Sequence, residues 1–345
     1  MPGAPGWRRS RARAAIAASL ATVLAASTLL VPVRAAAPAS AAPGAAPGPA
    51  CRDGVARITA PLRAALAQRR FVAYQPTALQ VRDGRATRAD AASIRADLEI
   101  LRPYFDALVT YDAVNGAEQV PAIAAQLGFR ALVIGVWDPF DDVQVEAALQ
   151  AARRHPRLVV ALSLGNEMLF GRRRGHAELA ARIEAIRRRA PGLALSTTEP
   201  FHMFLEPRAA ALLSHVDFVL ANVHPVFEAW FRGAPDANAA RFVVEVTGLL
   251  AATHCGPVLV KETGVPTAPA SSGFSAERQR GFYLALQREF PPSASRAFAW
   301  FSAFDAPWRV ADWHPVPGAH PEEAHWGLFD AARRPKPVVA VIPRR

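Results

Sequence analysis

The chain has 345 residues, of which 51% are hydrophobic and 20% are charged. This balance is that of an ordinary globular protein and excludes a wholly disordered or fibrous chain. The formal net charge is +11, but five of the arginines precede residue 51 and the others are scattered, with no basic repeat interleaved with aromatic residues. We therefore expect a solvated basic surface and no nucleic-acid partner.

The N-terminal segment has the three parts of a secretory signal. Arginines cluster at 8–13, an uncharged stretch follows at 14–33, and small alanine-rich sequence comes next. This pattern predicts a signal peptide over residues 1–42 and hence export, to the periplasm or the medium. Because the uncharged stretch is about long enough to cross a bilayer, an uncleaved membrane anchor is the alternative, and we favour cleavage.

The rest of the chain is interpreted as a linker and one domain. Residues 43–53 are rich in Ala, Pro and Gly and predict a short linker, and residues 54–345 predict a single folded domain, which we expect to be a monomer. The two cysteines, Cys51 and Cys255, either form a disulfide, as export allows, or remain unpaired thiols.

In chain order, a helical segment at 54–69 precedes a regular alternation of short apolar runs and amphipathic stretches. The apolar runs are β-branched, aromatic or nearly continuous, which is typical of strands buried on both faces. The amphipathic stretches carry apolar residues at helical spacing. Strands are predicted at 71–77, 107–112, 131–138, 158–167, 194–200, 218–225, 258–264 and 296–305, and helices at 90–103, 117–127, 142–154, 176–189 and 276–290.

This alternation predicts an α/β fold with parallel strands. Eight repeats over about 250 residues fit a closed (β/α)8 TIM barrel, and an open doubly wound sheet is the alternative. No G-x-G-x-x-G motif follows the first strand, which argues against a dinucleotide cofactor.

Polar residues collect at the C-terminal ends of the predicted strands. In a barrel these ends converge on one mouth, where catalytic groups lie. A core that served only stability would not hold so many carboxylates there, because unpaired buried charge is costly. The strand-end residues are Asp112, Asp138, Asn166, Glu167, Glu199, His224, Glu262 and Asp305.

Two of these residues are the best candidates for catalysis. Glu167 ends the fourth predicted strand and Glu262 ends the seventh. Two carboxylates across a barrel mouth are what glycoside hydrolysis requires, one protonated to assist the leaving oxygen and one ionised to attack the anomeric carbon. For either glutamate alone, a salt bridge at the mouth is the alternative. Lys261 precedes Glu262, and we interpret it as structural because adjacent strand residues point to opposite faces.

Several segments together resemble glycoside hydrolase family 17, the β-1,3-glucanase family. They lie in the expected order over about residues 70–332: TYD (110–112), GVWD (135–138), LGNE (164–167), TTEP (197–200), KETGVPT (261–267), FDAPWR (304–309) and HWGLFD (325–330). The resemblance implies a (β/α)8 barrel, a retaining mechanism with Glu167 as acid/base and Glu262 as nucleophile, and a β-1,3-linked glucan substrate. It also implies a place in the bacterial branch of the family, which includes transglycosylating members.

The chain departs from the family pattern in two segments. Val265 and Thr267 replace the Trp and Ser of E-T-G-W-P-S, and His224 and Val226 replace the tyrosines of N-x-Y-P-Y-F. Both changes touch the expected cleft and bear on the substrate more than on the reaction. There are two competing hypotheses. One is a non-catalytic glycan-binding barrel of the cell envelope, and the other is a hydrolase of the same clan that acts on another β-glycan.

The remaining candidates concern substrate binding. Aromatic rings pack on the C–H faces of sugars, so Trp137, Trp308 and Trp313 are potential platforms, whereas Trp300 is expected in the core. Asn166 is expected to bond a sugar hydroxyl, and Glu199 to bind substrate, orient the acid/base or form a salt bridge. Tyr74, Asp112 and His224 complete the predicted binding set.

We expect neither a metal nor an organic cofactor. No Cys/His cluster has structural-zinc spacing, and the histidines and glutamates at 320–325 lie in a predicted loop.

Overall fold

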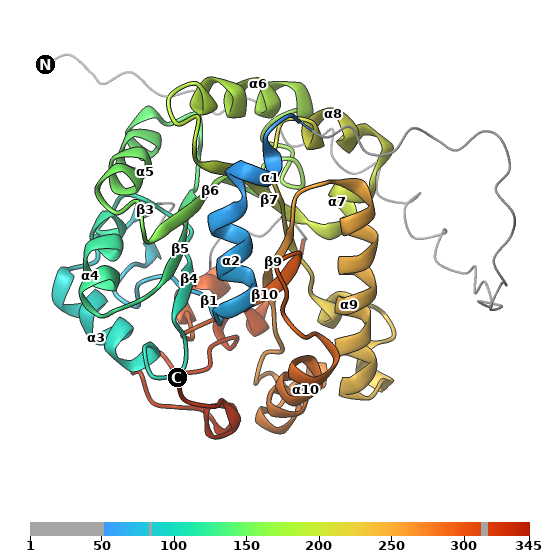
Figure 1. The fold of residues 1–345 in the computed structure, drawn as a ribbon. Coiled ribbons are helices and arrows are strands. Elements are labelled where there is room, and N and C mark those ends of the chain that lie inside the picture. Colours follow the sequence, from blue (N-terminus) through green and yellow to red (C-terminus); the bar gives the residue numbers. More distant parts are fainter. Residues whose placement is uncertain (1–51, 83–84, 312–316) are drawn as a thin grey trace, which may run out of the picture. The chain divides into compact units, whose positions relative to one another are not determined.

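The computed structural model describes residues 52–82, 85–311 and 317–345, all within the unit Pro47–Arg345. Eight parallel strands close into a barrel in which each strand pairs with its neighbours in chain order, and the last pairs with the first (Figure 1). These strands are β1 (Phe71–Ala73), β4 (Ala107–Val109), β5 (Ala131–Val136), β6 (Val159–Asn166), β7 (Ala194–Pro200), β8 (Val219–Asn222), β9 (Val258–Thr263) and β10 (Arg296–Trp300).

The predicted (β/α)8 barrel is therefore confirmed, and all eight strands lie within their predicted ranges. Most of them end earlier than predicted. The apolar sequence continues past the last ladder hydrogen bond, where the chain turns into the loops of the mouth. β10 is an example, because its run continues to Asp305 but ladder pairing ends at Trp300.

Helices surround the barrel and close one end of it. The outer helices that the sequence predicted are α3 (Ala91–Leu101), α4 (Val120–Gln126), α5 (Asp142–Arg154), α6 (His176–Arg187) and α10 (Ala276–Glu289). The helical segment predicted at 54–69 is divided into α1 (Val55–Ile58) and α2 (Ala60–Gln68). Leu62 and Leu66 of α2 pack with Phe71, Leu220 and other residues inside the barrel, so that α2 seals its N-terminal end.

The longest helix was not predicted. α9 (Asp236–Thr253) buries Val243, Val246 and Leu250 at helical spacing. Its β-branched VVEVT run and Gly248 have low helix propensity, although its apolar residues recur at helical spacing. The two signals conflicted, and no helix was predicted here. Burial of one face against the barrel outweighs that cost. The short α7 (Phe201–Leu205) and α8 (Ala210–Leu213) were also missed.

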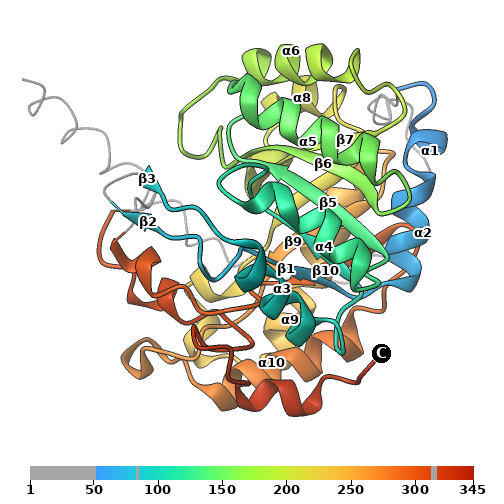
Figure 2. The same ribbon diagram turned by 90° about the vertical axis from the view of Figure 1, so that its left-hand side faces the viewer.

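Two further features lie at the mouth. A small hairpin pairs β2 (Val81–Arg82) with β3 (Arg85–Ala86), and the 3-10 segments η6 (Pro307–Ala311) and η7 (Pro321–Ala324) follow β10. A later 3-10 segment, η8 (Pro337–Val341), lies away from the mouth: it packs on α10, and Arg345 beyond it donates to the Gln68 carbonyl at the end of α2. Figure 2 shows α1 and α2 at one end of the barrel and the hairpin at the opposite end. None of these mouth segments was predicted.

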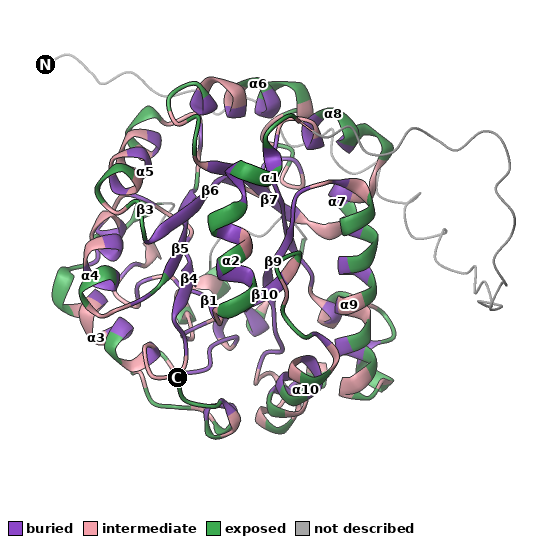
Figure 3. Cartoon of the chain, in the orientation of Figure 1, coloured by how far each residue is buried: buried purple, intermediate pink, exposed green. Residues whose placement is uncertain are grey.

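Burial follows the layers of the fold. The strands are buried on both faces, and each outer helix buries one stripe and exposes the other (Figure 3). Trp300 is fully buried, as expected of a core residue. The barrel therefore forms a packed frame, and cleft space is confined to the mouth.

The predictions for the N-terminus concern residues that lie largely outside the described ranges. The predicted signal at 1–42 lies there, as does Cys51; Cys255 is not a free thiol. Its pairing with Cys51 stays a prediction. Within the described ranges, no helix is long and apolar enough to cross a membrane.

Candidate active site

Glu167 stands directly after β6 and is held from two sides. Its backbone N–H donates to the Thr198 carbonyl at 2.7 Å, and its Oε1 accepts from Asn222 Nδ2 at 2.9 Å. Its φ of 53° lies in the left-handed region, which costs a residue with a side chain about 1–3 kcal/mol. Such strain persists only where the surroundings impose it, and here the contacts from Thr198 of β7 and Asn222 of β8 hold the residue.

The environment of Glu167 favours its protonated form. Burial raises the pKa of this carboxyl, and the nearby Glu262 carboxylate raises it further. The hydrogen bond from Asn222 and the charges of His224 and Lys261 act in the opposite direction without cancelling the increase. A buried carboxyl with a raised pKa suits a general acid.

Glu262 lies in the opposite electrostatic situation. Burial alone would raise its pKa, but the hydrogen bond from His224 and the charges of Lys261, His224 and Arg309 lower it to about 2. The His224 Nε2 to Glu262 Oε2 distance is 3.3 Å, and Lys261 Nζ lies 3.6 Å from Oε1. This carboxylate is therefore ionised at any ordinary pH, as a nucleophile must be.

The end of one strand orients both glutamates. Asn222 ends β8 and donates to Glu167, while His224, two residues further on, contacts Glu262. The His224 ring is itself packed against Trp326 and Phe301, with ring centroids 5.0 and 5.4 Å away. His224 was predicted to bind substrate; its position beside Glu262 gives it a contact with the carboxylate as well.

Lys261 does not turn away from the mouth as expected. Its Nζ lies 2.6 Å from Asn166 Oδ1 and 4.1 Å from the centroid of the Tyr111 ring, in addition to its contact with Glu262. Strand alternation governs where a Cβ points, but a flexible four-carbon side chain can carry its ammonium beyond that face. Strand alternation therefore does not keep the Lys261 ammonium away from Asn166 and Glu262, and the interpretation of Lys261 as structural rather than catalytic stays a prediction.

Three predicted substrate-binding residues have structural contacts instead. Tyr74 is fully buried and its hydroxyl donates to Asp97 Oδ2 at 2.9 Å. Glu199 is fully buried and accepts from the backbone N–H groups of Leu169 and Phe170 at 2.9 and 3.1 Å. Asp112 accepts from its own loop, through the N–H groups of residues 113 and 114 and the Asn115 amide. Without exposed polar atoms, Tyr74 and Glu199 have none to offer a sugar.

The contacts of Glu199 nevertheless fit one of the roles expected for it, which is to orient the acid/base. By fixing residues 169 and 170, it anchors the loop that follows Glu167 and so orients the acid/base candidate. Burial, assisted by the Glu167 charge, raises the pKa of Glu199 to about 7 against the two backbone hydrogen bonds.

The tryptophan candidates lie at the mouth. Trp137 is 43% exposed, and the Arg173 guanidinium lies 5.5 Å from its ring centroid. Trp308 is half-buried in η6. Trp313 lies outside the described residues. An exposed ring and a half-buried ring are both open to a ligand face.

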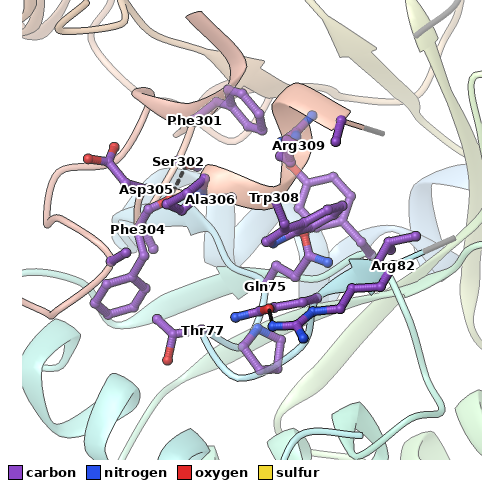
Figure 4. Close-up of a pocket in the computed structure, with 18 residues that line it drawn as sticks. Gln75, Thr77, Arg82, Phe301, Ser302, Phe304, Asp305, Ala306, Trp308 and Arg309 are labelled. Atoms are coloured by element: carbon purple, nitrogen blue, oxygen red, sulfur yellow. Dashed lines mark hydrogen bonds between the residues drawn. The ribbon is translucent and has the colours of Figure 1, made fainter. Parts of the chain in front are cut away.

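A cleft of about 830 Å³ opens at the mouth, and neither glutamate lines it. Two of its lining residues, Tyr111 and Arg309, lie close enough to Glu262 to interact with it electrostatically. Figure 4 shows Trp308, Gln75 and Arg82 around this cavity, which Arg309 and Phe301 also line. Its walls come from the segment after β1, the β2–β3 hairpin, Tyr111 after β4, and residues 301–311 after β10.

Sequence reasoning missed several of these residues. Asn222 and Arg309 lie inside segments that were quoted as motifs, but nothing in the motifs showed that they reach the glutamates. Arg309 pairs with Glu323 at 3.0 Å; burial alone would lower its pKa, but Glu323 and Glu262 raise it. The hairpin residues carried no signal, because a strand of two residues has no periodicity.

A closed (β/α)8 barrel whose mouth holds one ionised carboxylate and one carboxyl of raised pKa is an arrangement that glycosidases use. The family comparison agrees, since the BtgE/BtgC glycoside hydrolase domain matches residues 72–327. The chain belongs to this family and is a glycosidase, as the sequence predicted.

Individual relatives are distant. A glucan 1,3-beta-glucosidase of Arthroderma benhamiae is 24% identical over 269 residues, which cover 72% of this chain and 84% of the relative. The crystal structure of the glycoside hydrolase family 17 beta-1,3-glucanosyltransferase from Rhizomucor miehei has a TM-score of 0.61 at 24% identity, covering 78% of this chain and 95% of that chain. An active-site mutant of that enzyme in complex with laminaritriose gives a TM-score of 0.61 at 23% identity, covering 78% and 96%. The structural likeness establishes the shared fold.

Proposed function

We propose that this chain is an exported retaining glycosidase that hydrolyses or transfers β-1,3-linked glucan, with Glu167 as acid/base and Glu262 as nucleophile. The observation that carries the proposal is the opposite shift of two pKa values in one mouth, with Glu262 at about 2 and Glu167 raised. The names of the relatives, a glucan 1,3-beta-glucosidase and a beta-1,3-glucanosyltransferase, support the linkage.

The proposed reaction has two displacements. In the first, Glu262 bonds to the anomeric carbon, the glycosidic C–O bond breaks, and Glu167 gives its proton to the leaving oxygen. In the second, Glu167 takes a proton from an incoming hydroxyl, whose oxygen bonds to the anomeric carbon and releases Glu262. Water as the acceptor gives hydrolysis, and a sugar hydroxyl gives transfer.

Other residues would hold the sugar during these steps. Asn166 accepts from Lys261 through Oδ1, so that its Nδ2 group is the part left to donate to a sugar hydroxyl. Trp137 and Trp308 offer ring faces at the mouth. His224 keeps the Glu262 carboxylate oriented.

The first test is product analysis of the purified protein on laminari-oligosaccharides, with initial anomeric configuration followed by NMR. We expect shortened or elongated products that first appear as the β-anomer. First products with the α-configuration would contradict retention. Binding without turnover would favour the glycan-binding barrel, and turnover only of other β-glycans would favour the same-clan alternative.

The two glutamate roles are separated by azide rescue of alanine variants. Glu262→Ala with azide should form an α-glycosyl azide, because azide then attacks from the nucleophile's side. Glu167→Ala, assayed on a substrate with a good leaving group, should form a β-glycosyl azide, because azide replaces the second-step acceptor. The matched control is Glu146→Ala, which removes a glutamate paired on the surface of α5 with Arg153 and Arg189. The assignment fails if either variant gives the other's product or keeps full turnover without azide.

We also propose that residues 1–42 direct export and are removed. The mass of the protein recovered from an expressing cell measures this directly. A mature chain beginning near residue 43 in the periplasm or medium is expected, and a full-length chain in the membrane fraction would support the anchor alternative.

A further inference from the structure

A fully buried lysine, Lys261, lies beside Glu262 and the side-chain amide of Asn166. Lys261 has a side chain that is 1% exposed, and its ammonium contacts Asn166 Oδ1 at 2.6 Å and Glu262 Oε1 at 3.6 Å. Tyr111 covers the ammonium with its ring face at 4.1 Å. A buried cation is retained only when its partners compensate the loss of water, so that this geometry is held by all three contacts.

The contact with Asn166 has a directional consequence. An ammonium only donates, and the atom of the amide facing it must therefore be the oxygen. The amide nitrogen is then turned away from Lys261 and is the group left for a ligand. Without the lysine, nothing on β9 selects between the two orientations of this amide.

We propose that Lys261 is a positioning residue, which fixes the orientation of the Asn166 amide and holds Glu262 for attack. This inference rests on the proposed function, since it assigns Lys261 to the same two-step reaction. Lys261 does not exchange protons with the sugar; it acts through Asn166 and Glu262.

The charge of Lys261 gives the proposal a pH signature. Burial lowers its pKa to about 8, with the charges of Glu262 and Glu167 acting upward and that of Arg309 downward. Tyr111 faces it from the loop after β4 and has a pKa raised by burial and by Glu262, so that it stays neutral here. The ammonium is present below about pH 8 and is lost above it, and the orientation that it imposes is lost with it.

The first experiment is a double-mutant cycle of Lys261→Met and Asn166→Ala on the glucan turned over by the wild type. If Lys261 acts through Asn166, each single variant should lose about 10²-fold in kcat, the loss typical of a misplaced group. The double variant should lose little more than either single one, because the two residues act as a unit. Additive losses, or a kcat of Lys261→Met within twofold of wild type, would overturn the proposal.

The chain supplies a matched control in its only other lysine. Lys336 is also mostly buried, and its Nζ contacts Asp305 at 2.7 Å and Thr267 at 2.9 Å. Lys336→Met removes a buried ammonium without touching Asn166 and should show no coupling to Asn166→Ala. Thermal unfolding of every variant separates loss of fold from loss of rate, and Lys261→Arg provides a variant that keeps the charge if Lys261→Met unfolds.

The pH signature is measured with an activated aryl β-laminaribioside, whose leaving group needs no proton. Deprotonation of Glu167 then does not change the rate of the first step. The decrease of kcat/KM at alkaline pH therefore measures the deprotonation of Lys261. We expect a midpoint near pH 8 in the wild type and its displacement to higher pH in Lys261→Arg. A midpoint that stays unchanged in Lys261→Arg would contradict the role of the lysine.

A readout without turnover distinguishes failure of this inference from failure of the proposed function. Protein labelled with ε-¹³C-lysine gives two resonances, and Lys336→Met identifies which belongs to Lys261. The Lys261 resonance should titrate near pH 8, and Glu262→Gln should lower its midpoint by removing the opposite charge. An inactive wild type with this titration would overturn the proposed function, and with it the role in the reaction, but not the contacts assigned to Lys261. An ordinary lysine titration in an active enzyme would overturn the role of Lys261 and leave the proposed function standing.

Discussion

Glu167 and Glu262 carry the same side chain in one mouth, and their neighbours make them different reagents. Asn222 donates one hydrogen bond to Glu167, whereas Glu262 has an imidazole and an ammonium beside it. The hydrogen bond from His224 and the charges of Lys261 and Arg309 outweigh the cost of burying the Glu262 carboxylate. On the proposed assignment, the positive charge beside Glu262 is what makes this glutamate the nucleophile and leaves Glu167 as the acid.

This distribution predicts a wide acidic range of activity. With the pKa of Glu262 at about 2, the nucleophile remains ionised on acidification, and the raised pKa of Glu167 keeps the acid protonated further into the neutral range. The hydrogen bond from His224 is the largest influence that lowers the pKa of Glu262. His224→Phe should therefore move the acidic limb of kcat/KM to higher pH.

The measurement is a pH profile of kcat/KM for wild type and His224→Phe, with enzyme stability checked at each pH. His155→Phe is the control, since this residue lies at the C-terminal end of α5, away from the mouth. An acidic limb already near the ordinary glutamate pKa of about 4.3 in the wild type would contradict the assigned environment.

At the scale of elements, β7 supports the loop that presents the acid/base. Glu199 fixes the loop through two backbone N–H groups that have no place in a strand ladder. Glu199→Ala should leave these groups unpaired, which costs about 1–3 kcal/mol, and should release the left-handed conformation of Glu167. We expect kcat to fall about 10²-fold with KM changed little, because orientation is lost more than binding.

Steady-state kinetics and chemical denaturation measure these two effects on the same protein. Glu184→Ala, which removes another partly buried glutamate from α6, controls for a general loss of stability. An unchanged kcat in Glu199→Ala would show that the loop holds its conformation without this anchor.

The loop after β10 contributes an aromatic ring, that of Trp308, to the lining of the cleft. Trp308→Ala should raise KM for oligosaccharides about 10-fold, an effect of the size that one aromatic contact provides, with kcat less affected. Trp230→Ala is the matched control, because Trp230 is a partly exposed tryptophan that packs on Phe242 and does not line the cleft. Equal effects of the two variants on KM would remove Trp308 from the binding surface.

The elements also show what sequence can and cannot predict. Strands buried on both faces carry a signal in every residue, and for this reason all eight were found and Glu167 and Glu262 could be placed at strand ends. A strand end does not show where a side chain points, so Tyr74 and Glu199 were given substrate contacts although both are fully buried. The substrate contact expected of Asp112, which is only partly buried, stays a prediction. Asn222 and Arg309 reach the site only through the tertiary fold.

For the barrel as a whole, the segment after η7 connects the C-terminal part of the chain to α3 and to the loop after β1. Arg333 donates to the fully buried Asp97 at 2.6 Å and to Ser93 Oγ at 2.7 Å, both on α3. Tyr74 of the loop after β1 completes the contact from the other carboxylate oxygen. This cluster joins parts of the chain that are more than two hundred residues apart.

Arg333→Ala should therefore lower the free energy of unfolding by about 3 kcal/mol, since it leaves a buried carboxylate without its cation. Arg334→Ala removes the neighbouring arginine, whose pair with Asp330 is exposed, and should cost no more than about 1 kcal/mol. Urea unfolding followed by circular dichroism measures both. Similar losses for the two variants would show that the cluster at Asp97 is not a stabilising contact.

The β2–β3 hairpin stands apart from this frame, although it forms one wall of the cleft. Its residues are outside the barrel ladder, and the catalytic glutamates are held by β6, β8 and β9. On the proposed function, the groups that carry out the reaction and part of the surface that would select the sugar chain thus come from separate parts of the polypeptide. We expect exchange of a few hairpin residues to change the substrate range while the reaction itself is kept.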